Sequence, residues 1–106
     1  MRILLDECLP RALRKGLPGH EVRTVSEMGW GGVKNGALLR LAEGRFEVLT
    51  TVDRGMPFEN PVERRRIALA VLRAAGIRWD QLAPLVPALL DALPTMGPGE
   101  VRRFDA

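Results

Sequence analysis

The sequence predicts an α/β fold, specifically a three-layer α/β/α sandwich with a central, mostly parallel sheet. Short apolar runs rich in Leu, Ile, Val and Thr recur along the chain, bounded by polar residues, as is typical of buried parallel strands. Segments with helical spacing of apolar residues separate these runs, and such alternation indicates a parallel sheet covered by helices. A length of 106 residues suits one domain, so residues 1–106 are expected to form a single unit.

Five strands are expected, at residues 3–5, 21–25, 47–52, 67–72 and, as an edge strand, 101–104. A first helix is expected at 9–17, because Pro10 is tolerated in a first turn and Gly16 is a stop signal. After the second strand, Ser26 is expected to cap a short helical turn that contains Glu27.

An amphipathic helix is expected next along the chain, with Asn35 as its N-cap and Gly44 as its stop. Residues 55–61 are rich in turn-forming residues and are expected to form a loop. Apolar residues at three- and four-residue steps over 79–93 predict the last helix, and Pro84 and Pro87 predict that it is kinked or split. Trp79 is expected in the core, and an exposed apolar strip on this helix would suit a homodimer.

The composition is that of an ordinary globular protein, with a mild excess of positive charge. Lys and Arg number 16 against 13 Asp and Glu, giving a net charge of +3. Most of the positive charge is arginine, which indicates either phosphate recognition or a codon bias toward Arg. A single cysteine, no apolar run of about 20 residues and no signal peptide together predict a cytoplasmic protein.

Two carboxylates follow directly from predicted strands, Asp6 after the first and Asp53 after the third. In an open α/β sheet the carboxyl ends of the strands line the crevice where ligands bind. Two bare carboxylates at ~4 Å would repel each other by about 4 kcal/mol at an effective dielectric near 20. A divalent cation is the usual way to offset that repulsion, so a metal site is expected at this edge.

Each candidate residue also has an alternative, purely structural role. Asp6 serves either as a metal ligand or as a cap for the helix that follows it. Glu27 is either a third acid or an exposed surface residue, and Asn35 is a good N-cap whose oxygen can also face a metal. Arg54 contacts either a substrate or its neighbour Asp53, where an exposed ion pair would contribute little.

Other chemistries are less consistent with the sequence. His20 is read as a turn residue, and Cys8 has no partner base for a thiol mechanism. Glu7 diverges from its neighbour Asp6 on leaving the strand and ranks below it. The glycines at 29–32 lack the Lys and the context of a phosphate-binding loop, and there are too few Cys and His residues for a zinc site.

Four fragments occur in order along the chain: ILLDECLP, GHEVRTVSEMGWGG, KNGALL and TTVDRGMP. With the closing LAPLVPALL they resemble the PIN-like domain family of predicted toxin nucleases, and the resemblance covers essentially the whole chain. It implies an α/β/α sandwich whose acidic residues hold Mg²⁺ or Mn²⁺ and hydrolyse phosphodiester bonds, usually in RNA and less often in DNA. It also implies a toxin that pairs with a small antitoxin protein.

The resemblance assigns roles by position. Asp6, Glu27 and Asp53 match the family's catalytic acids, and Asn35 stands where many members place an Asp at a helix start. An amide oxygen can ligate Mg²⁺ but brings no charge, so weaker metal binding is implied. Arg54, or the cluster formed by Arg64, Arg65 and Arg66, would clamp the phosphate backbone.

Two rival functions stay open. One is a PIN-like module with weak or no catalysis that binds a protein partner or RNA, which the amide at Asn35 favours. The other is a phosphoryl-accepting domain of the response-regulator type. That function needs a Lys near the end of a later strand, whereas Lys15 and Lys34 lie elsewhere.

Overall fold

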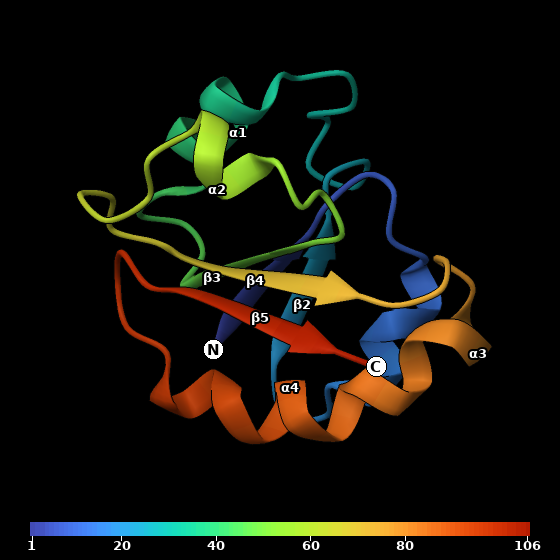
Figure 1. Ribbon diagram of the computed structural model, residues 1–106. Helices are drawn as coiled ribbons and strands as arrows, with labels where there is room; N and C mark the ends of the chain where they lie inside the picture. Colours follow the sequence, from blue (N-terminus) through green and yellow to red (C-terminus); the bar gives the residue numbers. More distant parts are fainter.

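Five parallel strands form a single sheet in the computed structural model, which describes residues 1–106 (Figure 1). The strands are β1 (Arg2–Leu5), β2 (Glu21–Thr24), β3 (Val48–Thr51), β4 (Ala68–Arg73) and β5 (Val101–Asp105). Their order across the sheet is β2-β1-β3-β4-β5, and every neighbouring pair is parallel. The carboxyl ends of all five strands therefore lie at one edge of the sheet, and the amino ends at the opposite edge.

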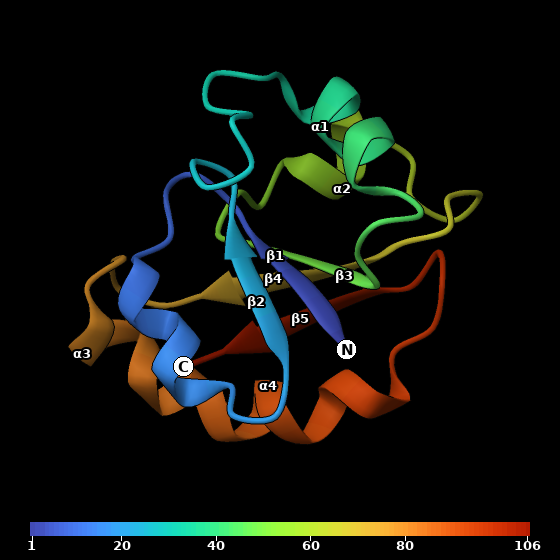
Figure 2. The ribbon, with the colours of Figure 1, turned by 180° about the vertical axis from the view of Figure 1, so that it is seen from behind.

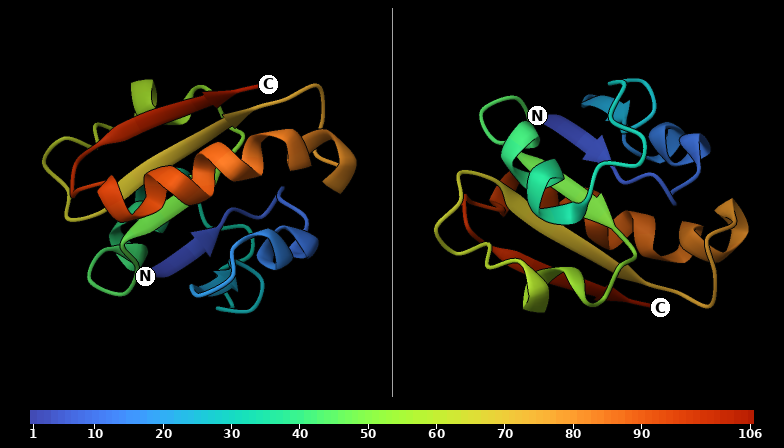
Figure 3. Two further views of the ribbon diagram at one scale, coloured as in Figure 1. Left: turned by 90° about the horizontal axis from the view of Figure 1, so that it is seen from below. Right: turned by 90° about the horizontal axis from the view of Figure 1, so that it is seen from above.

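Helices lie on both faces of the sheet (Figures 1 and 2). One face is covered by α1 (Asn35–Ala42) and α2 (Met56–Glu59). The other face is covered by the 3₁₀ helix η1 (Arg11–Gly16) and by a C-terminal run of helical turns. That run consists of α3 (Trp79–Leu82), η2 (Ala83–Leu85), α4 (Val86–Ala92) and η3 (Leu93–Thr95). Figure 3 shows α4 crossing the strands on one face and α1 on the other.

Successive side chains along each strand point to opposite faces of the sheet and so pack into two separate hydrophobic cores. Leu4 and Leu49 belong to the core under α1 and α2, whereas Ile3, Leu5 and Val48 belong to the core under η1 and α4. All five are fully buried. Strands buried on both faces need apolar residues at successive positions, which is why the strand sequences read as continuous apolar runs.

All five predicted strands are present, and their ends differ from the prediction by at most one residue. The α/β class and the parallel sheet are thus confirmed. None of the helices combines the length and the apolar character that crossing a bilayer requires.

The first helix is shorter and tighter than predicted, because residues 11–16 form a 3₁₀ helix preceded by Pro10. Gly16 ends it but has a second role in packing. A Cβ at this position would lie 2.7 Å from Cγ1 of Val86 and 3.2 Å from the ring of Trp79. The absence of a side chain therefore lets η1 approach the C-terminal helices closely.

Two further expectations needed correction. The predicted loop at 55–61 contains the one-turn helix α2. The last helix is split as its prolines predicted. Its leucines pack against the sheet, whereas Pro84, Pro87 and Ala88 are exposed, and the homodimer expected from an exposed apolar strip stays a prediction. Trp79, expected in the core, is 39% exposed at the start of α3.

Candidate functional site at the carboxyl edge

Asp6 and Asp53 lie just beyond the carboxyl ends of β1 and β3, which are neighbours in the sheet. Side chains two residues apart in a strand point to the same face, so Asp6 points to the same face as Leu4. Thr51 and Asp53 likewise point to the same face as Leu49. The side chains therefore emerge on the face of the sheet that carries α1 and α2. The topology brings these two predicted acids to the same edge and the same face.

The hydroxyl group of Thr51 joins the two acidic residues. It donates a hydrogen bond to Oδ2 of Asp6 at 2.6 Å and accepts one from the backbone N–H of Asp53 at 3.0 Å. The other oxygen of Asp6, Oδ1, accepts the backbone N–H of Glu7 at 2.8 Å. Thr51 is fully buried and Asp6 is 9% exposed, so the Asp6 carboxylate is held in one orientation.

Asn35 contacts Asp53 instead of capping its helix. Its Nδ2 donates to Oδ2 of Asp53 at 2.9 Å, while the N-cap position belongs to Lys34, which makes no side-chain cap. Oδ1 of Asp53 accepts the backbone N–H of Gly55 at 2.9 Å. The capping role predicted for Asn35 was wrong, and the structure instead places its amide beside Asp53.

Glu59 reaches the same place from α2. A Cβ built on Gly55 would lie 3.2 Å from Oε1 of Glu59 and 3.4 Å from Oδ1 of Asp53, so the missing side chain leaves a space between the two carboxylates. The sequence reasoning missed both Glu59 and Thr51. Period-two alternation back from Asp53 could have indicated Thr51, whereas Glu59 depends on the helical turn of α2.

Glu27 is not brought together with Asp6 and Asp53. Thr24, which points toward the opposite face in phase with Val22, donates its backbone N–H to Oε1 of Glu27 at 2.8 Å. In return, the backbone N–H of Glu27 donates to Oγ1 of Thr24 at 3.1 Å, and Arg14 forms an ion pair with the carboxylate. Thr24 thus holds the cap role that was predicted for Ser26.

These contacts also stabilise the charged form of Glu27. The backbone N–H of Thr24, followed by the Arg14 guanidinium, lowers the pKa of the Glu27 carboxyl from its ordinary value. An acid already neutralised by an arginine and a backbone donor is poorly suited to bind a cation.

The predicted arginines divide between the two edges of the sheet. Arg54 is exposed beside Asp53 and forms no ion pair. Residues 64–66 precede β4 and so lie toward the amino edge, where Arg65 pairs with Glu43 at the end of α1. The structure therefore keeps Arg54 near the acids and does not bring Arg64, Arg65 and Arg66 to them.

Negative charge without an arginine partner concentrates at the carboxyl edge. Of the thirteen acidic residues, seven form ion pairs with arginines. The other six are Asp6, Glu7, Asp53, Glu59, Glu63 and Asp91. Four of these six, Asp6, Glu7, Asp53 and Glu59, come soon after the ends of β1 and β3, whereas Glu63 lies closer to the start of β4. Such an imbalance favours binding of a cation at this edge.

Asp6, Asp53 and Asn35 offer side-chain oxygens, the kind of ligand that Mg²⁺ and Mn²⁺ take. No three Asp, Glu, His or Cys side chains group closely enough to form a metal centre on their own. Mg²⁺, however, usually keeps several waters and takes only one or two protein carboxylates. Asp6 and Asp53 are two carboxylates at this edge, the Asn35 amide lies on Asp53, and Glu59 approaches Asp53 across Gly55.

Cys8 takes no part in this chemistry. Burial raises the pKa of its thiol, and the carboxylates of Asp6 and Asp53 raise it further. A thiol with a raised pKa is protonated at neutral pH and is neither a nucleophile nor a metal ligand. The influence of both carboxylates on one thiol also agrees with their common location.

The resemblance to PIN-like nucleases rests on four short fragments of the sequence, and two of them contain Asp6 and Asp53. Comparison of the chain with family models, with curated proteins and with solved structures gives no match.

Proposed function

We propose that this chain is a metal-dependent ribonuclease of the PIN-like type that hydrolyses phosphodiester bonds at Asp6 and Asp53. The observation that supports it best is the chain of hydrogen bonds from Asp6 through Thr51 to Asp53 and Asn35. It orients two carboxylates at the ligand-binding edge of a parallel sheet, where negative charge lacks arginine partners.

The residues would divide the work as follows. Asp6 and Asp53 would hold Mg²⁺ or Mn²⁺, with Asn35 as a neutral oxygen donor. A bound divalent ion of this kind polarises a phosphoryl oxygen and lowers the pKa of a coordinated water. Thr51 keeps Asp6 in position, and Arg54 supplies positive charge next to Asp53 for a phosphate group.

The proposal includes a biological setting. The resemblance supports a toxin with a small antitoxin partner, acting on RNA in the cytoplasm. Glu27 is not part of the proposed centre, because Thr24 and Arg14 already satisfy its carboxylate.

The test is cleavage of single-stranded RNA in Mn²⁺ by three aspartate variants. We expect Asp6→Asn and Asp53→Asn to lower the rate by about 100-fold or more while the circular dichroism spectrum is unchanged. Asp91→Asn is the matched control, since Asp91 is exposed on α4 and has no ion pair. Wild-type rates for either of the first two variants would exclude a nuclease centre at these residues.

A second candidate is a non-catalytic module that binds RNA or a protein. It is favoured by the lack of a third close carboxylate and by the amide at Asn35. Retained RNA binding by a chain that shows neither cleavage nor calorimetric binding of Mn²⁺ would select this alternative.

A further inference from the structure

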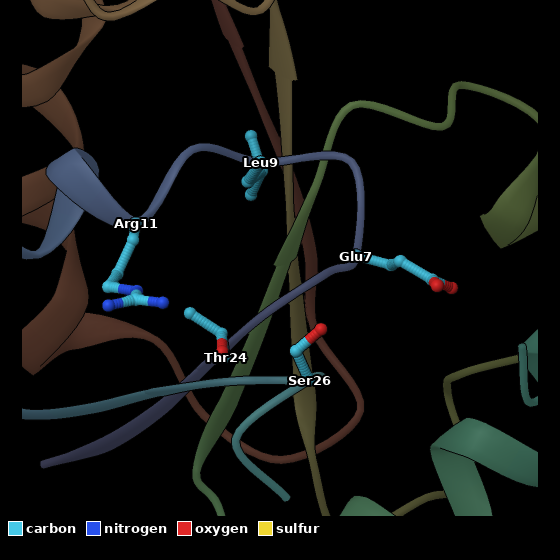
Figure 4. Close-up of a pocket in the computed structure, with 5 residues that line it drawn as sticks. All are labelled: Glu7, Leu9, Arg11, Thr24 and Ser26. Atoms are coloured by element: carbon cyan, nitrogen blue, oxygen red, sulfur yellow. The ribbon is translucent and has the colours of Figure 1, made fainter. Parts of the chain in front are cut away.

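A small polar hollow lies beside the loop that follows β1. Its volume is about 140 Å³, and it is lined by Glu7, Leu9, Arg11, Thr24 and Ser26 (Figure 4). At ~30 Å³ per water, this is room for roughly four or five waters, or for a group of five heavy atoms such as a phosphate. The lining begins at the residue that follows Asp6, so the hollow adjoins the proposed centre.

The hollow offers donors that have no partner within the protein. Arg11 is exposed and forms no ion pair, in contrast to Arg14 on the same helix. The hydroxyl of Ser26 makes no hydrogen bond, and that of Thr24 only accepts one. In Figure 4 the guanidinium of Arg11 lies toward Thr24. Guanidinium and hydroxyl groups are the usual ligands of phosphate oxygens.

Of the two acidic groups near the hollow, Glu27 is paired with Arg14, and Glu7 carries its charge on the side away from Arg11. Glu7 lines the hollow, but its Oε1 accepts the backbone N–H of Gly32 at 3.1 Å, and in Figure 4 its carboxylate extends away from Arg11. Glu27 is held by Thr24 and Arg14. A second, more open hollow of about 330 Å³ continues from Arg11 and is lined by Ala12, Arg14 and Lys15. Positive charge therefore extends outward from the small hollow along η1.

We infer that the hollow at Arg11 is a phosphate-binding subsite that receives a second phosphate group of the RNA strand. Arg11 binds the phosphate oxygens by charge-assisted hydrogen bonds, and Ser26 and Thr24 add neutral donors. This assignment rests on the proposed function for the identity of the strand, but the binding of a phosphate group does not require cleavage. The group is either an internal phosphodiester or a terminal phosphate.

The experiment is a nuclear magnetic resonance titration of the ¹⁵N-labelled chain in EDTA, first with inorganic phosphate. We expect saturable shifts at the amides of Leu9, Arg11 and Ser26. Arg11→Gln should weaken binding by about tenfold or more, and Ser26→Ala by about threefold. Both residues are exposed, so both variants should fold. Arg40→Gln, an equal loss of charge on the exposed side of α1, is the control and should bind like the wild type.

RNA trinucleotides with and without a 5′-phosphate then distinguish the two sources. Tighter binding of the phosphorylated trinucleotide assigns a terminal phosphate, whereas equal affinities that are both reduced in Arg11→Gln assign an internal one. Equal binding by Arg11→Gln and Arg40→Gln, or shifts that spread over all arginine-rich segments without saturation, would overturn the subsite. Because the titration contains no divalent ion, loss of the subsite and loss of cleavage by Asp6→Asn are independent results.

Discussion

Two adjacent threonines in β3 provide a test of how the site is held. Thr50 and Thr51 are both fully buried, but their hydroxyls face opposite sides of the sheet. Thr51 donates to Asp6 and accepts from the N–H of Asp53, whereas the hydroxyl of Thr50 is buried with no hydrogen-bond partner. The same substitution, Thr→Val, should therefore have opposite consequences at the two positions.

The magnitudes follow from the bonds that are lost. A hydrogen bond to a charged group contributes about 1.5–3 kcal/mol and a neutral one about 0.5–1.5 kcal/mol. Thr51→Val removes one of each and leaves Asp6 buried without its donor, so we expect a loss of about 2–4 kcal/mol. Thr50→Val replaces an unpaired buried hydroxyl with a methyl group, and we expect no loss or a gain of up to about 1 kcal/mol.

The assay is urea unfolding of the wild type and both variants, followed by circular dichroism, with thermal melts alongside. For a domain of this size a loss of 2 kcal/mol lowers Tm by roughly 10 °C. Thr51→Ser keeps the hydroxyl and should recover most of the stability. If Thr50→Val and Thr51→Val unfold at the same urea concentration, the hydrogen bonds of Thr51 do not hold the site together.

Three other measurements test neighbouring contacts. The lowered pKa of Glu27 means that its contribution to stability is present above its ordinary value of 4.5 and is lost as the pH falls below it. The urea midpoints of the wild type and Glu27→Gln should therefore differ at pH 7 and converge well below pH 4.5; a constant difference would contradict the ion pair with Arg14. Asn35→Asp replaces the donor to Asp53 with a second carboxylate, so it should destabilise the chain in EDTA and tighten Mg²⁺ binding in calorimetry. An unchanged Mg²⁺ affinity would place Asn35 outside the metal site. Because Asp6 and Asp53 help to raise the pKa of Cys8, Asp6→Asn and Asp53→Asn should each speed alkylation of this single thiol by iodoacetamide at pH 7. Rates equal to that of the wild type would show that neither carboxylate acts on Cys8.

The strands and their common direction could be predicted from sequence because the signals are local. Runs such as Ala68–Leu72 are apolar at successive positions, as a strand buried on both faces requires. Once helices were expected between the strands, this alternation predicted a parallel sheet, which places Asp6 and Asp53 at its carboxyl edge. Pro84 and Pro87 likewise predicted that the last helix is split, because the proline ring removes a backbone N–H and clashes with the preceding helical turn.

The partners of the side chains were decided only by the tertiary structure. The resemblance placed Glu27 among the acids, but η1 packs on the other face and places Arg14 beside it. Asn35 had the sequence pattern of an N-cap, yet the approach of Asp53 from β3 gave its amide a charged acceptor. In both cases a contact between distant parts of the chain replaced the local preference, because a charged hydrogen bond stabilises more than a neutral cap does.

By itself, the sequence determined a single parallel α/β sheet with Asp6 and Asp53 at one edge. The tertiary structure decided which residues complete that edge: Thr51 between the two acids, Asn35 on Asp53, and Glu59 across the space left by Gly55. The physical reason is range. Backbone pattern follows from neighbours in sequence, whereas the composition of a site depends on how separately formed segments pack, and that packing is set by the two cores as a whole.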